Sequence, residues 1–267
     1  QLRGDIARAR RIFAYAQLLS RRDLRTQLWA IEDAVSRGDI AGALKQYDIT
    51  LRTSTFAPDL LFPVLSGAIA DPAIRTALIH TLAAKPAWTQ SFVEYVAIYG
   101  YVATNGLDPR NVFSLFVGLR RAGVPISENA RTVLVNALLS GKFHDDAWRY
   151  YASVRPGADR RISRDPRFAA TLDTPSLLDW VPIDDAGISA SIQHGDRGGV
   201  FDFFAPASVG GAMLRQMQLL PTGSYVLRGH SLDIDQPDGS RPYWTLACQD
   251  GRELGRVALP NSAQAGG

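Results

Sequence analysis

Two stretches of the sequence, 34 residues apart, repeat each other. Residues 4–20 read GDIARARRIFAYAQLLS and residues 38–54 read GDIAGALKQYDITLRTS, with six of the 17 aligned positions identical. An aromatic residue also stands at the same place in both copies, Phe13 and Tyr47. This period is typical of a helix–turn–helix hairpin that buries its apolar side only against a neighbouring hairpin. The repeat therefore predicts a stacked array of helices in the first part of the chain.

The residues that both copies share suit particular positions in such a hairpin. Gly38, like Gly4 before it, suits the turn, because glycine adopts a left-handed backbone easily. Asp39 then stands where an N-cap is needed. Ala43 is small enough for two helices to cross closely, and Tyr47, one turn later, fills the space beside the crossing.

On these residues, the stretch 1–54 resembles tetratricopeptide repeats. The proline that closes each repeat in that family is missing, because Arg21 and Thr55 occupy its positions. The first unit also lacks its leading helix, so the resemblance implies an array that begins before Gln1. We expect the first helix of each hairpin to line a concave face that grips a peptide or a partner protein. In the second unit, three residues of one helix would contribute to this face: Arg25, Leu28 and Glu32.

Helical patterns continue after the repeat, although they are less regular. Pro72, Asp108 with Pro109, and Ser127 are typical signals of a helix start. We expect nine or ten helices across residues 5–154. The helices predicted after the repeat span 59–70, 72–84, 91–106, 108–123, 127–141 and 144–157.

From about residue 177 the pattern changes to short runs of β-branched and aromatic residues between Gly, Pro and Asp clusters. These runs predict an antiparallel β-sandwich, with strands over 188–193, 199–205, 214–220, 224–233, 243–249 and 255–260. The net charge changes as well, from +7 over residues 1–166 to −4 over residues 167–267. The chain is therefore predicted to be α + β with two domains: a tetratricopeptide-like α-helical array over 1–157, a linker over 158–176, and a jelly-roll-like β-sandwich over 177–267.

Composition disfavours two classes of protein. No run of 18 consecutive apolar residues is present, so no transmembrane helix is expected. There is also no secretory leader, although a chain that begins at Gln1 suggests a trimmed form, and we expect membrane association only through a segment outside this sequence. Nucleic-acid binding is not expected, because the basic half has no aromatic-interleaved basic stripe and no recognition motif.

The sequence carries no recognisable catalytic or cofactor motif. The four histidines have no metal-site spacing, and neither HExxH nor CxxC occurs. The glycine-rich stretch 195–199 precedes a predicted strand rather than a helix, so it predicts a turn and not a phosphate cradle. We therefore expect a protein that is not an enzyme and needs no cofactor. The alternative is a polysaccharide-acting enzyme, since some polysaccharide lyases join helices to a β-sandwich; a cleft holding His144, Tyr150 and arginines would favour it.

Two features of the predicted sandwich leave alternatives open. Asp233, Asp235 and Asp238 lie on a glycine-containing loop and form a weak calcium candidate, although a solvated hairpin explains them equally well. The single cysteine, Cys248, is either a buried small hydrophobe or the partner of a cysteine outside this sequence. It is not expected to be a nucleophile.

Aromatic residues are concentrated in the predicted sandwich. Phe201 and Phe203 share a parity and are expected to face inward, whereas exposed aromatic faces could stack on sugar rings. The candidate glycan-binding residues are Trp180, Phe204 and Tyr243.

The stretch 179–255, with its LLPTGSY turn at 219–225, resembles the jelly-roll, carbohydrate-binding-module-like domains of bacterial envelope proteins. Together with the helical repeats, the chain is similar to tetratricopeptide-type proteins of proteobacterial exopolysaccharide systems. The resemblance implies a scaffold of the periplasm or cell envelope, although a cytoplasmic location stays open. Its helices would bind a protein partner and its sandwich a polysaccharide. The alternative is a purely protein–protein adaptor whose sandwich is a structural cap.

Overall fold

The computed structural model describes residues 5–102, 107–184, 187–195, 198–206 and 209–263. Within these residues the first part of the chain forms nine α-helices between Ile6 and Val154, which confirms the expected number and extent. They are α1 (Ile6–Leu19), α2 (Leu24–Ser36), α3 (Ile40–Thr53), α4 (Ala57–Ala68), α5 (Pro72–Ala83), α6 (Thr89–Val102), α7 (Pro109–Arg121), α8 (Glu128–Ser140) and α9 (His144–Val154).

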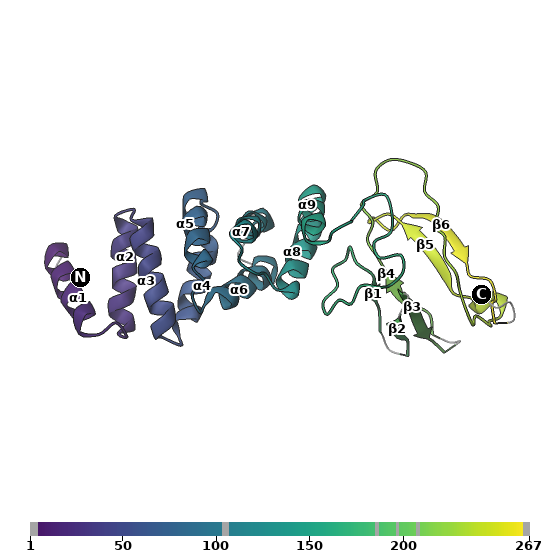
Figure 1. The fold of residues 1–267 in the computed structure, drawn as a ribbon, viewed down its shortest axis with the longest axis horizontal. Helices are drawn as coiled ribbons and strands as arrows, with labels where there is room; N and C mark the ends of the chain where they lie inside the picture. The colour runs from purple at the N-terminus through teal and green to yellow at the C-terminus, as the bar shows by residue number, and fades with distance from the viewer. Residues whose placement is uncertain (1–4, 103–106, 185–186, 196–197, 207–208, 264–267) are drawn as a thin grey trace.

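The helices follow one another along the long axis of an elongated molecule (Figure 1). Helix α4 packs on α6 and α6 on α8, while α3 packs on α5, α5 on α7 and α7 on α9. In Figure 1, α4, α6 and α8 form the lower row and α5, α7 and α9 the upper row. From α3 onward, the second helix of each predicted hairpin thus packs on its equivalent in the next, as expected for an array of repeated units.

The predicted turn and cap residues lie where the sequence placed them. Gly38 has a φ of +70°, the left-handed conformation that favours glycine. The carboxylate of Asp39 accepts a hydrogen bond of 2.8 Å from the backbone N–H of Gly42, and Asp5 accepts one of 2.9 Å from Arg8. Ser127 caps α8 in the same way. Gly4 lies outside the described residues.

The apolar core runs through the array from α2 to α9 and ends at Leu178. Ala43 and Tyr47, the small residue and the aromatic of the second repeat, are both buried. Further along, Phe62 of α4 contacts Phe92 of α6 edge to face, with ring centroids 5.2 Å apart. Each fully buried side chain of this size stabilises the fold by about 1.5–3 kcal/mol. Helix α1 differs, because none of its residues is buried.

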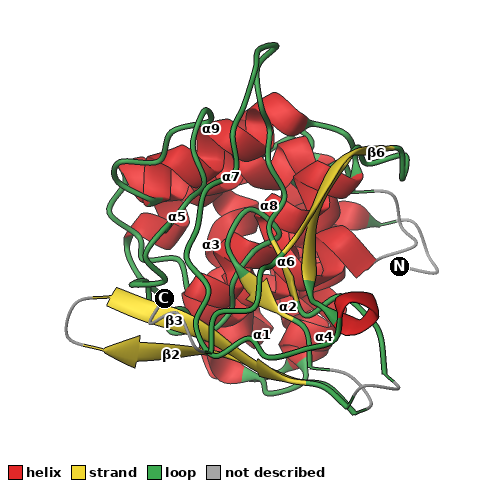
Figure 2. Ribbon diagram, turned by 90° about the vertical axis from the view of Figure 1, so that its right-hand side faces the viewer, coloured by secondary structure: helices red, strands yellow, loops and turns green. Residues whose placement is uncertain are grey.

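The described residues after α9 form three separate two-stranded antiparallel sheets. These pair β1 (Val181–Pro182) with β4 (Leu214–Arg215), β2 (Ser189–Gly195) with β3 (Gly198–Phe204), and β5 (Tyr243–Ala247) with β6 (Glu253–Ala258). The chain is therefore of the α + β class. In the end-on view of Figure 2, the β2–β3 hairpin and β6 lie on different sides of the molecule, so the described strands do not form one continuous sandwich.

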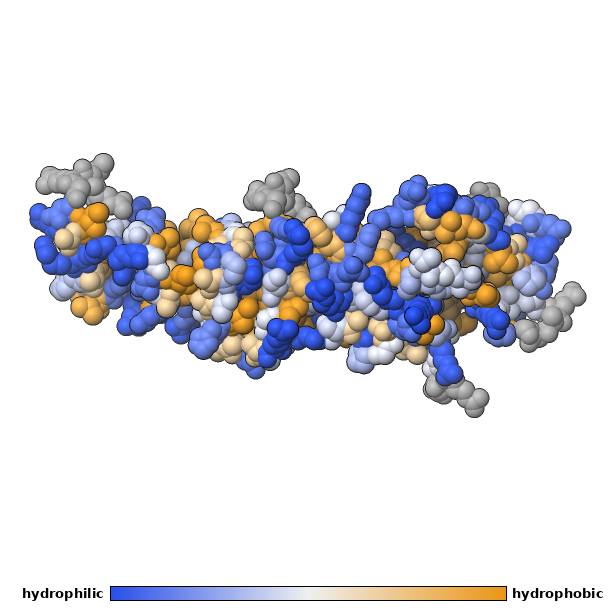
Figure 3. Space-filling view, turned by 90° about the horizontal axis from the view of Figure 1, so that it is seen from above, coloured by the Kyte–Doolittle hydropathy of each residue, from blue (hydrophilic) through white to orange (hydrophobic). Residues whose placement is uncertain are grey.

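Two of the predicted strands are wrong. The run 214–220 forms a strand only over Leu214–Arg215, and 224–233 forms none. Residues 221–230 are all exposed. A strand needs a partner strand and a surface to pack on, which β-favouring residues alone do not provide. In Figure 3, orange apolar side chains gather around a hollow over the strand-containing end of the molecule.

The segment predicted as a linker packs against both parts of the chain. Arg164 is buried and donates hydrogen bonds from Nε to the carbonyl of Leu178 (2.7 Å) and from Nη1 to Oε1 of Gln218 (2.6 Å). On the helical side, the Tyr151 hydroxyl donates to Oδ1 of Asp179 (2.7 Å). These buried bonds fix the end of the array to the start of the strand-containing part.

Candidate partner-binding surfaces

The three residues predicted for the helical binding face all lie on α2. Arg25 and Glu32 are exposed, and neither makes an ion pair in the part of the chain that the structure describes. Leu28 is half-buried and packs against the apolar core. Two of the three residues are therefore available to a partner, while the third mainly supports the helix from below.

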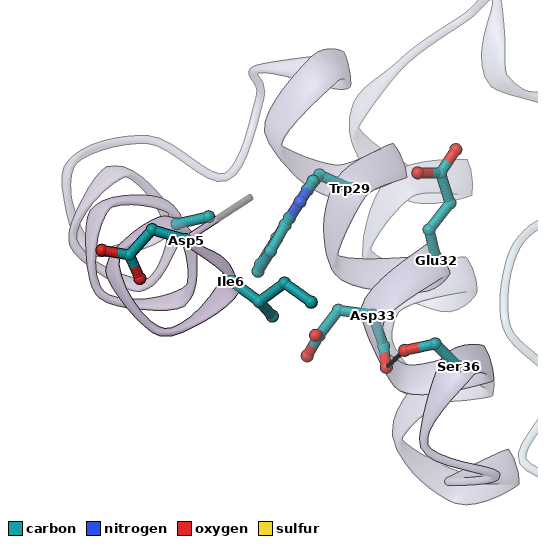
Figure 4. Close-up of a pocket in the computed structure, with 7 residues that line it drawn as sticks. Asp5, Ile6, Trp29, Glu32, Asp33 and Ser36 are labelled. Carbon is teal, nitrogen blue, oxygen red and sulfur yellow. Dashed lines mark hydrogen bonds between the residues drawn. The ribbon is translucent and has the colours of Figure 1, made fainter. Parts of the chain in front are cut away.

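Glu32 lines an open groove of about 280 Å³ between α1 and α2 (Figure 4). Ile6 and Ala9 come from α1, whereas Trp29 and Glu32 come from α2. The Trp29 ring stacks on Phe13, the aromatic residue of the first repeat, with ring centroids 4.3 Å apart. This contact holds Trp29 in place at the side of the groove. The groove is lined by Asp5, Ile6, Ala9, Trp29, Glu32, Asp33 and Ser36.

The three carboxylates of the groove are not equally available. Asp5 caps α1, and Asp33 accepts hydrogen bonds from Nε of Arg10 (2.8 Å) and Nε of Arg37 (3.2 Å). Burial on its own raises the pKa of Asp33, but the two arginines outweigh it and hold the pKa below its usual value. Glu32 is the carboxylate without such a bond among the described residues, so it is the one that can meet a cation.

An apolar wall beside a free carboxylate suits a long basic side chain. Figure 4 shows Trp29 pointing toward α1 and the Glu32 carboxylate pointing away from it, so a basic side chain with its aliphatic stem on Trp29 reaches Glu32 only at the outer edge of the groove. Of these two residues, the sequence analysis identified Glu32 as a binding residue but not Trp29. The signal for Trp29 was its place one turn before Asp33 on the same side of the helix.

The predicted glycan-binding residues lie on separate elements. Trp180 is half-buried between Phe168 and Trp244, and its indole N–H donates to the carbonyl of Asp165 (3.2 Å). It is therefore part of the packing rather than an open platform. Phe204, at the end of β3, is 69% exposed, and Tyr243, at the start of β5, is 53% exposed. The guanidinium of Arg256 lies 4.3 Å from the Tyr243 ring centroid.

The remaining aromatic and acidic residues singled out in the sequence differ in exposure. Phe201 and Phe203 stack on each other at 5.6 Å and are half-buried. The Asp233, Asp235 and Asp238 side chains are all exposed, and Asp238 pairs with Arg241. Among the described residues, no group of three or more His, Cys, Asp or Glu side chains is placed to hold a metal ion.

The structure also places Cys248 and two of the residues, Tyr150 and His144, that would favour the enzyme alternative. Cys248 is half-buried, with its Sγ 3.6 Å from Nη2 of Arg252. Tyr150 is 1% exposed and packs against Phe113 and Phe116, so a substrate cannot reach its hydroxyl. His144 begins α9. Tyr150 therefore does not line a cleft of the kind that would favour the enzyme alternative.

Two general comparisons bear on the chain as a whole. Among the residues that the structure describes, no helix has both the length and the apolar content needed to cross a bilayer. Comparison of the chain with protein-family models, with curated protein sequences and with solved structures gives no match.

Proposed function

We propose that this chain is a non-enzymatic scaffold whose helical array, of the tetratricopeptide type, binds a partner protein. The observation that carries the proposal concerns α2, α4 and α6, the first helices of three successive predicted hairpins. Each of them stays uncovered on one side of the array. Helix α2 exposes Arg25 and Glu32, α4 exposes Leu60 and Val64, and α6 exposes Tyr99. We call these side chains the first-helix side. Side chains presented by consecutive rigid helices are the usual means by which such arrays hold an extended or helical partner segment.

The groove between α1 and α2 supports the same proposal. Its wall of Trp29 and its free carboxylate, Glu32, fit a basic side chain of the partner, as described above. Binding there would neutralise Glu32 without breaking the bonds of Asp33 to Arg10 and Arg37.

Site-specific photo-crosslinking tests this function. A photo-reactive amino acid replaces Glu32 or Arg25 in the full chain, expressed in its native host, and the matched controls carry it at Lys45 of α3 or Thr76 of α5, which are also exposed. We expect one defined protein adduct from the first pair and none from the controls. Equal labelling from all four positions, or no adduct from Glu32 and Arg25, would contradict a binding site on the first-helix side.

We further propose that the strand-containing part contacts a polysaccharide of the cell envelope, in a periplasmic setting. The supporting observation is the exposure of Phe204 and Tyr243, since an exposed aromatic ring can stack on the apolar face of a sugar. A glycan array probed with the full chain tests this. Saturable binding that is lost in Tyr243→Ala or Phe204→Ala supports it. No binding to any glycan favours the alternative, a purely protein–protein adaptor.

A further inference from the structure

Helix α4 carries an uninterrupted apolar strip on its exposed surface. Phe56, the residue at its N-cap, is 72% exposed, Leu60 is 50% exposed and Val64 is 60% exposed. Pro63 and Gly67 lie on the same surface. These positions recur at three- and four-residue spacing, so they share one face of the helix. We call Phe56, Leu60, Pro63, Val64 and Gly67 the α4 strip.

The strip lies in the interior of the array and is not explained by the packing of α4. Its opposite face already supplies the core, through residues such as Leu61, Phe62 and Leu65. An exposed helix face is normally polar or charged, because apolar side chains gain nothing from water there. Proline and glycine are in addition the least favourable residues for the interior of a helix. The composition of the strip therefore costs stability in the free chain, which points to a contact.

Positive charge gathers at one end of the strip. Arg21, Arg22 and Arg25 are exposed, and their guanidinium groups make no ion pair among the described residues. The Thr53 hydroxyl donates to the carbonyl of Arg21 (3.2 Å), which ties the start of α2 to the end of α3, three residues before Phe56. Figure 1 shows α2 and α4 beginning at the same lower end of the array.

The charge at this end is not cancelled by α4 itself. Asp59 is the one charged residue of α4, and together with Asp23, the exposed N-cap of α2, it offsets two of the three arginines, which leaves a net positive charge. The positive N-terminal ends of the α2 and α4 helix dipoles add to the same sign. A partner group at this end of the strip should therefore be acidic.

We propose that the α4 strip docks an amphipathic helix of a partner protein, with carboxylates at the end that meets Arg21, Arg22 and Arg25. The apolar strip is about three turns long, so a helix of similar length can lay its own apolar side chains along it. Gly67 has no atom within 4 Å of where a Cβ would stand, so the partner backbone can approach closely at that point. This inference rests on the proposed function and gives it a partner chemistry.

A second copy of the chain fits the strip less well than an acidic helix. The strip of a second copy brings no acidic cluster to the arginines, since Asp59 is the only charged residue of α4. Self-association is therefore treated as an outcome of the test.

Fluorescence anisotropy with two labelled 16-residue helical peptides tests the proposal on the full chain. The peptides share leucines at three- and four-residue spacing, and one carries glutamates in its first turn where the other carries lysines. We expect the acidic peptide to bind at least tenfold more tightly than the basic one. The double variant Leu60→Ser with Val64→Ser should lose this binding tenfold or more. The control Ile162→Ser, at a 56% exposed site outside the array, should keep it.

A charge variant tests the polarity of the site. Arg22→Glu with Arg25→Glu should reverse the preference from the acidic to the basic peptide. Circular dichroism spectra confirm that each variant keeps its helix content. Equal affinity for the two peptides, or equal binding by the strip variant and the Ile162 control, would overturn the proposal.

Sedimentation velocity separates the remaining outcomes. A dimer that dissociates in the Leu60 and Val64 double variant but not in the Ile162 control would assign the strip to a second copy and overturn the proposal. If neither peptide binds while crosslinks from Glu32 still capture one protein, the scaffold function stands and the docking site on α4 is wrong. If the acidic peptide binds while Glu32 yields no adduct, the strip proposal stands and the groove is not part of the site.

Discussion

Two neighbouring tyrosines of α9 show how strongly a single hydrogen bond affects the contribution of a buried residue to stability. Tyr150 and Tyr151 are both buried, but among the described residues only the Tyr151 hydroxyl has a partner, the carboxylate of Asp179 at 2.7 Å. The Tyr150 hydroxyl is buried and finds no hydrogen-bond partner in the part of the chain that the structure describes. A buried polar group without a partner costs free energy, whereas a bond to a charged group stabilises the fold.

Phenylalanine substitutions at the two positions should therefore have different effects. Tyr151→Phe should lower the free energy of unfolding by about 1.5–3 kcal/mol, because it removes a bond to a buried charge. Tyr150→Phe should be neutral or raise it by up to about 1 kcal/mol. Urea unfolding of the two variants beside the parent chain measures this, and a larger loss for Tyr150→Phe would contradict the described environment of both rings.

Stability should also fall in alkaline solution. Burial raises the pKa of both tyrosines above their ordinary value of 10.0, and the Asp179 carboxylate adds to this for Tyr151. A raised pKa in the folded state contributes stability that is complete below the unfolded value and is lost as the pH rises beyond it. The free energy of unfolding should thus decline above about pH 10, and decline less steeply in the double Phe variant. Identical slopes for the two proteins would speak against this cause.

The caps and turns of the helices were predictable residue by residue, because they depend on neighbours in the sequence. Asp39 and Ser127 each cap the helix that the sequence assigned to them. Trp180 was predicted as an exposed glycan platform but packs against Phe168 and Trp244. This packing depends on residues that are brought together only by the fold, and the local sequence does not reveal them.

Among the elements, helices were predicted well and strands less well. The helix predicted over 108–123 is observed as Pro109–Arg121, since periodicity and end signals are local. The strand predicted over 224–233 is absent, because strand formation requires a partner segment that local propensity does not specify. The three- and four-residue spacing of the α4 strip is visible in the sequence, but only the structure shows which face of α4 is left uncovered.

Helix α1 should be the least stable helix of the array. It has no buried residue, whereas α8 buries Leu134, Leu138 and Leu139 among others. Segments with few buried apolar contacts open at low free energy and exchange their amide hydrogens early. In hydrogen–deuterium exchange, peptides from α1 should therefore label much faster than peptides from α8. Equal protection of the two helices would show that a further contact covers α1 in solution.

The α4 strip predicts that one substitution separates stability from binding. Gly67→Ala meets no atom within 4 Å, so it should raise the free energy of unfolding by about 0.5–1 kcal/mol through helix propensity alone. The added methyl group should at the same time lower the affinity for the acidic peptide, because the partner backbone approaches closely at this point. Urea unfolding of this variant measures the change in stability, and fluorescence anisotropy measures the change in peptide affinity. A gain in both stability and affinity would remove Gly67 from the docking site.

On the scale of the whole molecule, the array and the strand-containing part are joined by buried polar contacts. Arg164 bonds to Leu178 and Gln218, and Asp179 receives the Tyr151 hydroxyl. A partner held on the first-helix side would therefore be carried in a fixed orientation relative to Phe204 and Tyr243. The sequence indicated the two kinds of structure and the change of charge between them, but not this junction, whose residues are far apart in the chain.

Side-chain footprinting by hydroxyl radicals tests the central proposal most directly, with the full chain free and bound to the protein captured from Glu32. If the first-helix side is the binding surface, Leu60 and Val64 of α4 and Tyr99 of α6 lose reactivity in the complex. His80 of α5, exposed on the second helix of its hairpin, keeps its reactivity. Protection of His80 with no change at Leu60, Val64 and Tyr99 would place the partner elsewhere and contradict the account.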